Sequence, residues 1–182
     1  MAEVAPQRAG GNPGDPMKLA VITPVGPGHE ASAQRAMASV DAACGASCFS
    51  SVRHVIIEEH AGRMGRSHAR NLGMDAEADW FFFLDADDVM RPDALTRNVF
   101  DVPATFGAVS LNGVISHRNV DPCGWRQIAL HGARGTLSMG CFVRADVARN
   151  VRFDESLDAG EDFDFYMRLP GFRKIARPLV DI

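Results

Sequence analysis

Two short acidic motifs hold the residues of this sequence best suited to chemistry. Asp85 and Asp87 directly follow the apolar run Trp80–Leu84, and Glu161-Asp162 stands near the C-terminus. Because unpaired carboxylates are costly to bury, the run predicts a buried strand that ends at a solvated edge. On an extended chain, residues two apart point to the same side. Asp85 and Asp87 would then offer two hard oxygen donors to Mg²⁺ or Mn²⁺ carrying a phosphate ligand.

Other side chains near this edge could complete a site for a nucleotide. A divalent ion beside a diphosphate stabilises the charge that develops as the diphosphate leaves. Asp87 is the expected direct ligand, while Asp85 would reach ribose hydroxyls or the water shell of the ion. Thr23 and Glu58, at the ends of neighbouring strands, could hydrogen-bond a nucleobase. Arg70 could pair with phosphate or stack on a base.

Each motif also has a structural interpretation. The run Asp85–Asp88 could form a turn and cap a helix near Pro92. Glu58-Glu59 could be a solvated strand end, and Arg70 could be a surface residue in a salt bridge. Glu161-Asp162 could cap a helix, because acidic residues are enriched there. Alternatively, a carboxylate of this pair held near a hydroxyl could act as a general base. His60, His68 and His131 have no spacing typical of metal ligands and are interpreted as incidental.

Length and composition indicate one globular domain. The chain has 182 residues, 46% of them hydrophobic and 23% charged, and a net charge of −4 that does not favour nucleic-acid binding. No apolar run is long enough to span a membrane, and residues 1–16 resemble a disordered leader rather than a signal peptide. Cys44, Cys48, Cys123 and Cys141 show no CxxC spacing, so we expect reduced cysteines in a cytoplasmic protein.

The apolar pattern predicts alternating strands and helices in the first half of the chain. The expected strands cover 18–22, 52–57, 80–84, about 107–115, 140–144 and 172–176. The expected helices cover 30–43, 65–78, 92–100 and 163–169, and residues 116–138 are expected to be irregular. This order predicts an α/β fold with a mostly parallel central sheet flanked by helices. Ligands of such sheets bind beyond the carboxyl ends of the strands, where the polar residues described above gather.

Taken together, these motifs resemble the family 2 glycosyltransferases, which have the GT-A (nucleotide-diphospho-sugar transferase) fold. The resemblance covers about Lys18–Leu169. It rests on Leu19–Pro24, Ala69–Gly73, Asp79–Asp88, Met139–Arg144, Phe153–Glu155 and Gly160–Leu169. It implies one GT-A domain over residues 17–182, with a nucleotide-binding half at 17–103 and an acceptor-side half at 104–182.

The resemblance also implies an activity and a set of roles. The protein would be a metal-dependent, inverting, hexosyltransferase-like enzyme that moves a sugar from a nucleotide-diphosphate donor, by default a UDP-sugar, to an acceptor hydroxyl. The acceptor would be a glycan, a lipid-linked sugar or a protein. Asp162 would be the catalytic base, and Asp87 would bind Mn²⁺ or Mg²⁺ within a DxD motif. The implied nucleotide-sugar-binding residues are Thr23, Pro24, Glu58, Arg70, Asp85, Ala86, Asp87 and Glu161.

Three departures from the family pattern leave details open. The turn after the second strand reads Glu58-Glu59-His60-Ala61-Gly62 instead of an Asp-Asp-Gly-Ser-like turn, so the base and the donor sugar are not defined. No His follows Asp162, so the ion would depend mainly on Asp87 and the diphosphate. The chain also ends soon after Asp162, so we expect an acceptor site that is open or completed by a partner.

Two other functions fit parts of the pattern. A degenerate GT-A domain could bind nucleotide or a partner without turnover, although it would have no chemical need for Asp85, Asp87 and Asp162 together. The run Phe83–Met90 also resembles the first motif of haloacid-dehalogenase-type phosphatases, in which Asp85 would be a nucleophile. That family needs a basic residue, typically Lys, between its motifs. The sequence has Arg but no Lys in that interval.

Overall fold

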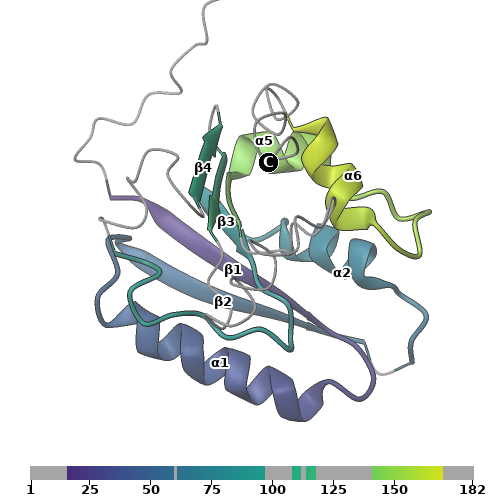
Figure 1. Cartoon of the computed structure of the whole chain (residues 1–182), viewed down its shortest axis with the longest axis horizontal. Coiled ribbons are helices and arrows are strands. Elements are labelled where there is room, and N and C mark those ends of the chain that lie inside the picture. The colour runs from purple at the N-terminus through teal and green to yellow at the C-terminus, as the bar shows by residue number, and fades with distance from the viewer. Residues whose placement is uncertain (1–15, 60, 97–107, 112–113, 118–140, 170–182) are drawn as a thin grey trace, which may run out of the picture.

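The computed structural model describes residues 16–59, 61–96, 108–111, 114–117 and 141–169. The helices and strands in these segments follow the chain in an α/β order (Figure 1). They are β1 (Lys18–Val25), α1 (Glu30–Cys44), β2 (Ser51–Glu58), α2 (Arg66–Gly73), β3 (Trp80–Phe83), β4 (Ala108–Leu111), β5 (Val114–His117), β6 (Cys141–Arg144), α5 (Ala145–Val151) and α6 (Glu161–Arg168).

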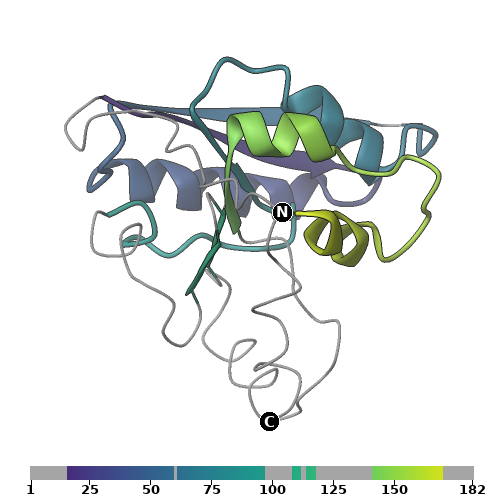
Figure 2. The same cartoon turned by 90° about the horizontal axis from the view of Figure 1, so that it is seen from above.

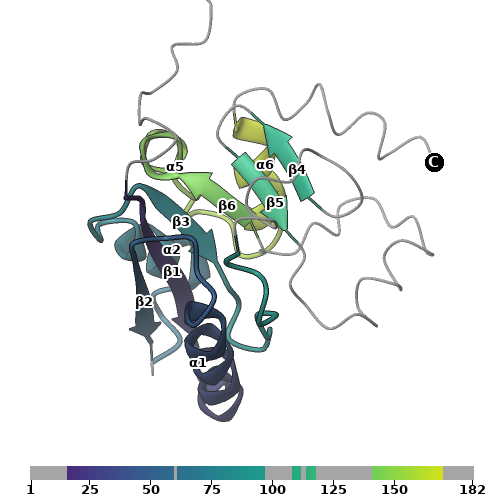
Figure 3. The same cartoon turned by 90° about the vertical axis from the view of Figure 1, so that its left-hand side faces the viewer.

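The strands form one sheet in the order β2-β1-β3-β6-β5-β4 (Figure 3). β1 pairs in parallel with both β2 and β3, as the repeated strand–helix units predict. β6 is antiparallel to β3, and β5 is antiparallel to both β6 and β4. The α/β class and the helix-flanked sheet are confirmed, and the parallel strands are those of the N-terminal half.

β1 is longer than expected, because it continues through Thr23 and Pro24 to Val25. The carbonyl of Ile22 accepts a hydrogen bond from Leu84 N–H just after β3, at 3.0 Å. Backbone groups alternate in direction along a strand, so Pro24 faces the same side as Ile22, where β3 has already ended. A proline there removes no hydrogen bond of the sheet, and the strand can continue.

The second helix is shorter than predicted. α2 ends at Gly73, and the guanidinium of Arg149 in α5 donates to the carbonyls of Met74 and Ala76, at 3.0 and 2.8 Å. These bonds stabilise the end of the helix in place of a further turn. Ala69 and Gly73 are buried, whereas Leu72 is exposed.

Other boundaries also differ from the prediction. The expected strand at 107–115 is two antiparallel strands, β4 and β5. The helix α5 was not predicted, and α6 begins at Glu161 rather than Phe163. Pro92 begins a turn in the described residues up to Thr96, rather than a helix. The predicted leader, the rest of the 92–100 helix, the irregular segment beyond His117 and the strand at 172–176 lie outside the described residues.

Hydrophobic side chains cover both faces of the sheet, because successive strand residues point in opposite directions. Ile22 and Phe83 belong to a cluster that includes residues of α5 and α6, whereas Val21 and Phe82 pack against α1. α1 and α2 accordingly lie on opposite sides of β1 and β2 (Figure 2).

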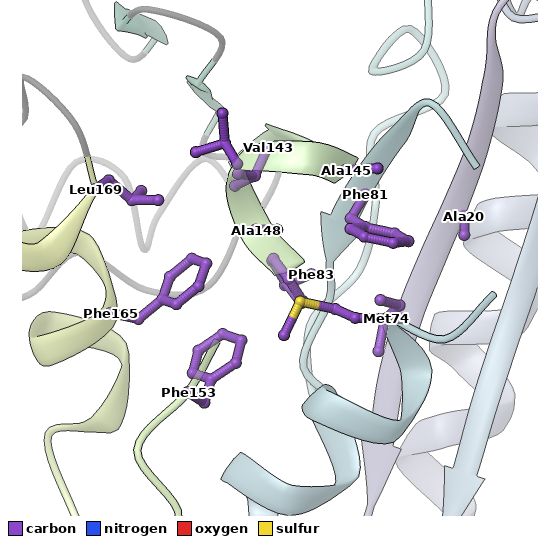
Figure 4. Close-up of a cluster of buried hydrophobic side chains, with 12 residues drawn as sticks. Ala20, Met74, Phe81, Phe83, Val143, Ala145, Ala148, Phe153, Phe165 and Leu169 are labelled. Carbon is purple, nitrogen blue, oxygen red and sulfur yellow. The ribbon is translucent and has the colours of Figure 1, made fainter. Parts of the chain in front are cut away.

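An aromatic cluster joins α6 to the end of β3. The ring of Phe83 lies 5.1 Å from that of Phe153 and 5.6 Å from that of Phe165, centroid to centroid (Figure 4). The rings of Phe153 and Phe165 are stacked at 4.1 Å. This packing holds the start of α6 near the residues that follow β3.

Candidate functional site

A buried arginine connects the two acidic motifs. Arg70 in α2 is 2% exposed. Its Nη2 donates to Asp85 Oδ1 at 2.6 Å, and its Nη1 donates to Glu161 Oε1 at 2.9 Å. Its guanidinium also lies over the ring of Phe153, at 5.3 Å. The structure therefore brings together three of the predicted site residues, which lie far apart in the sequence.

The charges of this cluster stabilise one another. Burial would lower the pKa of Arg70, but Asp85 and Glu161 outweigh it, so that the pKa is raised and the guanidinium stays charged. Glu161 is buried and lies 3.2 Å from Nε of Arg66, which is largely exposed. With both outer nitrogens of Arg70 bonded, its side chain links α2 to α6 and to the turn that follows β3.

Asn71, the neighbour of Arg70, fixes the segment that leads to α6. Its Nδ2 donates to Phe153 O at 3.0 Å and to Glu155 Oε1 at 2.7 Å. Its Oδ1 accepts from Phe153 N–H at 2.8 Å. The other oxygen of Glu155 lies 2.8 Å from Nδ1 of His68. His68, which was interpreted as incidental because its spacing is not typical of a metal ligand, thus makes an exposed contact with this segment.

Asp162 lies beside this cluster, in the first turn of α6. It is half-buried, and its Oδ1 accepts a hydrogen bond from Phe163 N–H at 2.7 Å. Burial raises the pKa of Asp162, and the charges of Glu161 and Asp85 add to this, while the Phe163 N–H and the charge of Arg70 oppose it. A carboxylate with a raised pKa is a better proton acceptor than an ordinary Asp.

Asp85 and Asp87 are arranged differently from the expectation. β3 ends at Phe83, and Asp88 N–H donates to Asp85 O at 3.0 Å, which closes a β-turn. The argument from an extended chain was therefore wrong for this pair. Asp85 is directed to Arg70 with its side chain 31% exposed, while Asp87 is exposed at the turn.

The donor set of this turn is compatible with a divalent cation. Asp87 presents a solvent-exposed carboxylate, and Asp85 is partly exposed next to it. Within the described residues, no group of three or more acidic, His or Cys side chains could by itself hold a metal. An ion at Asp87 would take its other ligands from water and from a bound diphosphate, as Mg²⁺ commonly does.

The remaining predicted residues surround the cluster rather than join it. Thr23 is fully buried, and its hydroxyl lies 2.9 Å from Nε2 of His54, on the face covered by α1. Pro24 and Ala86 are also buried. Glu58 is exposed at the end of β2. Thr23 therefore offers no hydroxyl to a nucleobase in this arrangement.

The residue after Glu58 organises the following loop. Glu59 Oε1 accepts a hydrogen bond from Ala61 N–H at 2.9 Å. Its pKa is lowered, because backbone N–H groups at Arg63, Met64, Ala61 and Gly62 outweigh the opposing effect of burial. Glu59 thus has a structural role in this turn. It also lines an open pocket of about 430 Å³ with Ala61, Arg63, Met64 and His68.

Several contributing residues were not predicted from the sequence. Asn71, Phe153 and Glu155 were noted as parts of motifs but given no role, and Arg66 was not noted. The one hint of these roles in the sequence was that two polar residues, Arg70 and Asn71, follow each other in a helix. On α2 these two side chains bind two different segments, α6 and the residues that precede it. Their partners in these two segments, Glu161, Phe153 and Glu155, lie more than eighty positions away and could not be read from spacing.

Solved structures share this fold. The chain aligns with Staphylococcus aureus TarS 1–349 at a TM-score of 0.53 and 17% identity, over 85% of this chain and 57% of that one. The TarS 1–349 complex with UDP aligns at a TM-score of 0.51 and 17% identity, over 82% of this chain and 54% of that one. The TarS 1–349 complex with UDP-GlcNAc aligns at a TM-score of 0.52 and 18% identity, over 82% of this chain and 52% of that one.

This likeness confirms the expected glycosyltransferase-like fold, and the chain spans little more than half the length of these TarS structures. No protein-family model matches the chain, and no curated protein matches it either. Among the helices in the described segments, none has the length and apolar character needed to cross a bilayer.

Proposed function

We propose that this protein is a metal-dependent, inverting family 2 glycosyltransferase that uses a nucleotide-diphosphate sugar, by default a UDP-sugar. The observation that carries the proposal is the Arg70 bridge between Asp85 and Glu161. It supports a single site in which the turn after β3 meets the start of α6, with Asp162 next to Glu161. The UDP and UDP-GlcNAc complexes of TarS, which has the same fold, support the choice of donor.

On the donor side, the turn after β3 would bind the diphosphate. Asp87 would hold Mn²⁺ or Mg²⁺, and the charge of such an ion would stabilise the negative charge of a departing nucleoside diphosphate. Asp85, which Arg70 holds in place, would hydrogen-bond the ribose hydroxyls or the water shell of the ion. Glu58, exposed at the end of β2, contributes to nucleotide binding. Pro24 and Ala86 are buried and contribute through the backbone of the strand end and of the turn in which they lie.

On the acceptor side, Asp162 would be the general base. Its Oδ1 is held by Phe163 N–H, so Oδ2 is the oxygen that takes the proton of the acceptor hydroxyl. The acceptor oxygen forms a bond to the anomeric carbon as the bond from that carbon to the diphosphate breaks. A single in-line displacement of this kind inverts the anomeric centre. The acceptor is a hydroxyl of a glycan, a lipid-linked sugar or a protein.

Calorimetry of UDP binding with and without Mn²⁺ tests the donor side. We expect Mn²⁺ to strengthen UDP binding, and Asp87→Ala to remove that gain. The exposed carboxylate of Asp41 on α1 provides a matched control, and Asp41→Ala should bind as the wild type does. Metal-dependent binding that is unchanged in Asp87→Ala would reject the assignment of the metal ligand.

Turnover tests the acceptor side and separates the alternatives. Asp162→Asn should retain UDP binding and lose transfer, measured as UDP released from a UDP-sugar in the presence of an acceptor mixture. UDP binding without any transfer or hydrolysis by the wild type would indicate a binding domain. Phosphate trapped on Asp85 would indicate a phosphatase, which the ion pair between Asp85 and Arg70 disfavours.

A further inference from the structure

β2 is an edge strand of the sheet that the described residues form. It pairs with β1 on one side, and no strand in the described segments pairs with its other side (Figure 3). Val55, Ile56 and Ile57 are only half-buried on this strand. An eight-residue edge with apolar side chains is a template for pairing with a further strand.

The direction of the backbone groups shows which residues are available for such pairing. Glu59 N–H donates to Val25 O of β1 at 2.9 Å. Backbone groups alternate in direction along a strand, so the N–H and C=O groups of the odd-numbered residues of β2 point toward β1. The N–H and C=O groups of the even-numbered residues point away from β1. These residues are Val52, His54, Ile56 and Glu58.

We propose that β2 pairs antiparallel with β2 of a second copy of this chain, about a two-fold axis at Ile56. A two-fold axis perpendicular to a continuous sheet places the same face of both copies on the same side of that sheet. Even-numbered residues of one β2 therefore lie opposite even-numbered residues of the other. Ile56 then faces its own counterpart, and Val55 faces Ile57 of the second copy. His54 faces Glu58 of the second copy, with backbone groups that both point outward.

Charge complementarity selects this register. Arg53, exposed on the same face as Val55, comes opposite Glu59 of the second copy. Backbone N–H groups lower the pKa of Glu59 and keep its carboxylate ionised. In the two neighbouring registers, Glu58 would lie opposite Val52 or Ile56 instead. The register centred on Ile56 is therefore the one of these three that places the guanidinium of Arg53 opposite the carboxylate of Glu59.

Sedimentation velocity over a wide concentration series tests the association. The wild type should form a dimer as concentration rises. Arg53→Glu should raise the dimer Kd about tenfold, because both symmetry-related pairs become repulsive. Arg35→Glu makes the same charge change on the exposed face of α1 and should leave the Kd unchanged. A wild type that stays monomeric throughout, or equal effects of the two variants, would overturn the proposal.

Disulfide trapping tests the register. Val55→Cys mixed with Ile57→Cys should give a cross-linked dimer on mild oxidation, whereas neither variant should cross-link alone. Cross-linking of Val55→Cys alone, or of Ile57→Cys alone, would indicate one of the other registers and contradict the pairing centred on Ile56. Peptide mass spectrometry against the oxidised wild type distinguishes these bonds from those of the native cysteines. Circular dichroism shows that each variant is folded.

Discussion

Removing the guanidinium of Arg70 should destabilise the fold through the charge that it leaves behind. In Arg70→Met, Glu161 keeps a carboxylate that is 4% exposed, and among the described residues the exposed Arg66, at 3.2 Å, is the cation left beside it. Asp85 is 31% exposed and recovers hydration. Breaking a buried pair typically costs about 3–5 kcal/mol. The partial compensation by Arg66 places the expected loss near the lower limit, at about 3 kcal/mol.

Urea unfolding followed by circular dichroism measures this loss. Arg66→Met removes an exposed guanidinium from the carboxylate of Glu161 and serves as the matched control. It should cost less than about 1 kcal/mol. Arg70→Met/Glu161→Leu removes the buried carboxylate as well, so stability should return to within about 1 kcal/mol of the wild type. A loss below about 1 kcal/mol in Arg70→Met would refute the reasoning. So would a double variant no more stable than Arg70→Met.

Three further predictions concern the site and its support. Because the pKa of Asp162 is raised, its carboxylate becomes protonated at a higher pH than that of an ordinary Asp, and kcat should fall there as pH is lowered. A fall of kcat only in the pH range of an ordinary Asp would contradict this. Gly73→Ala should cost about 1–3 kcal/mol in thermal unfolding, because its Cβ would overlap Ile22 Cγ2; an unchanged Tm would show that the contact relaxes. Asn71→Ala should cost about 2–3 kcal/mol in urea, because it leaves the buried Phe153 N–H unbonded; retention of full stability would exclude this role.

The strand–helix order could be predicted because it depends on local patterns. The apolar runs of β1, β2 and β3 and the alanine-rich α1 all lie close to their expected places. Helix ends were less predictable. α2 ends at Gly73, and the carbonyls beyond this end bond Arg149, which lies far along the chain.

The sequence by itself determined which residue types are available for chemistry and that strand ends would carry them. Asp85, Asp87 and Asp162 were identified in this way, since polar residues after apolar strands must reach water. Only the tertiary structure decided their surroundings. Arg70 is buried between Asp85 and Glu161, and Thr23 faces away under α1. Such pairings depend on the packing of α2 and α6 against β3, and chain separation carries no information about contacts of this range.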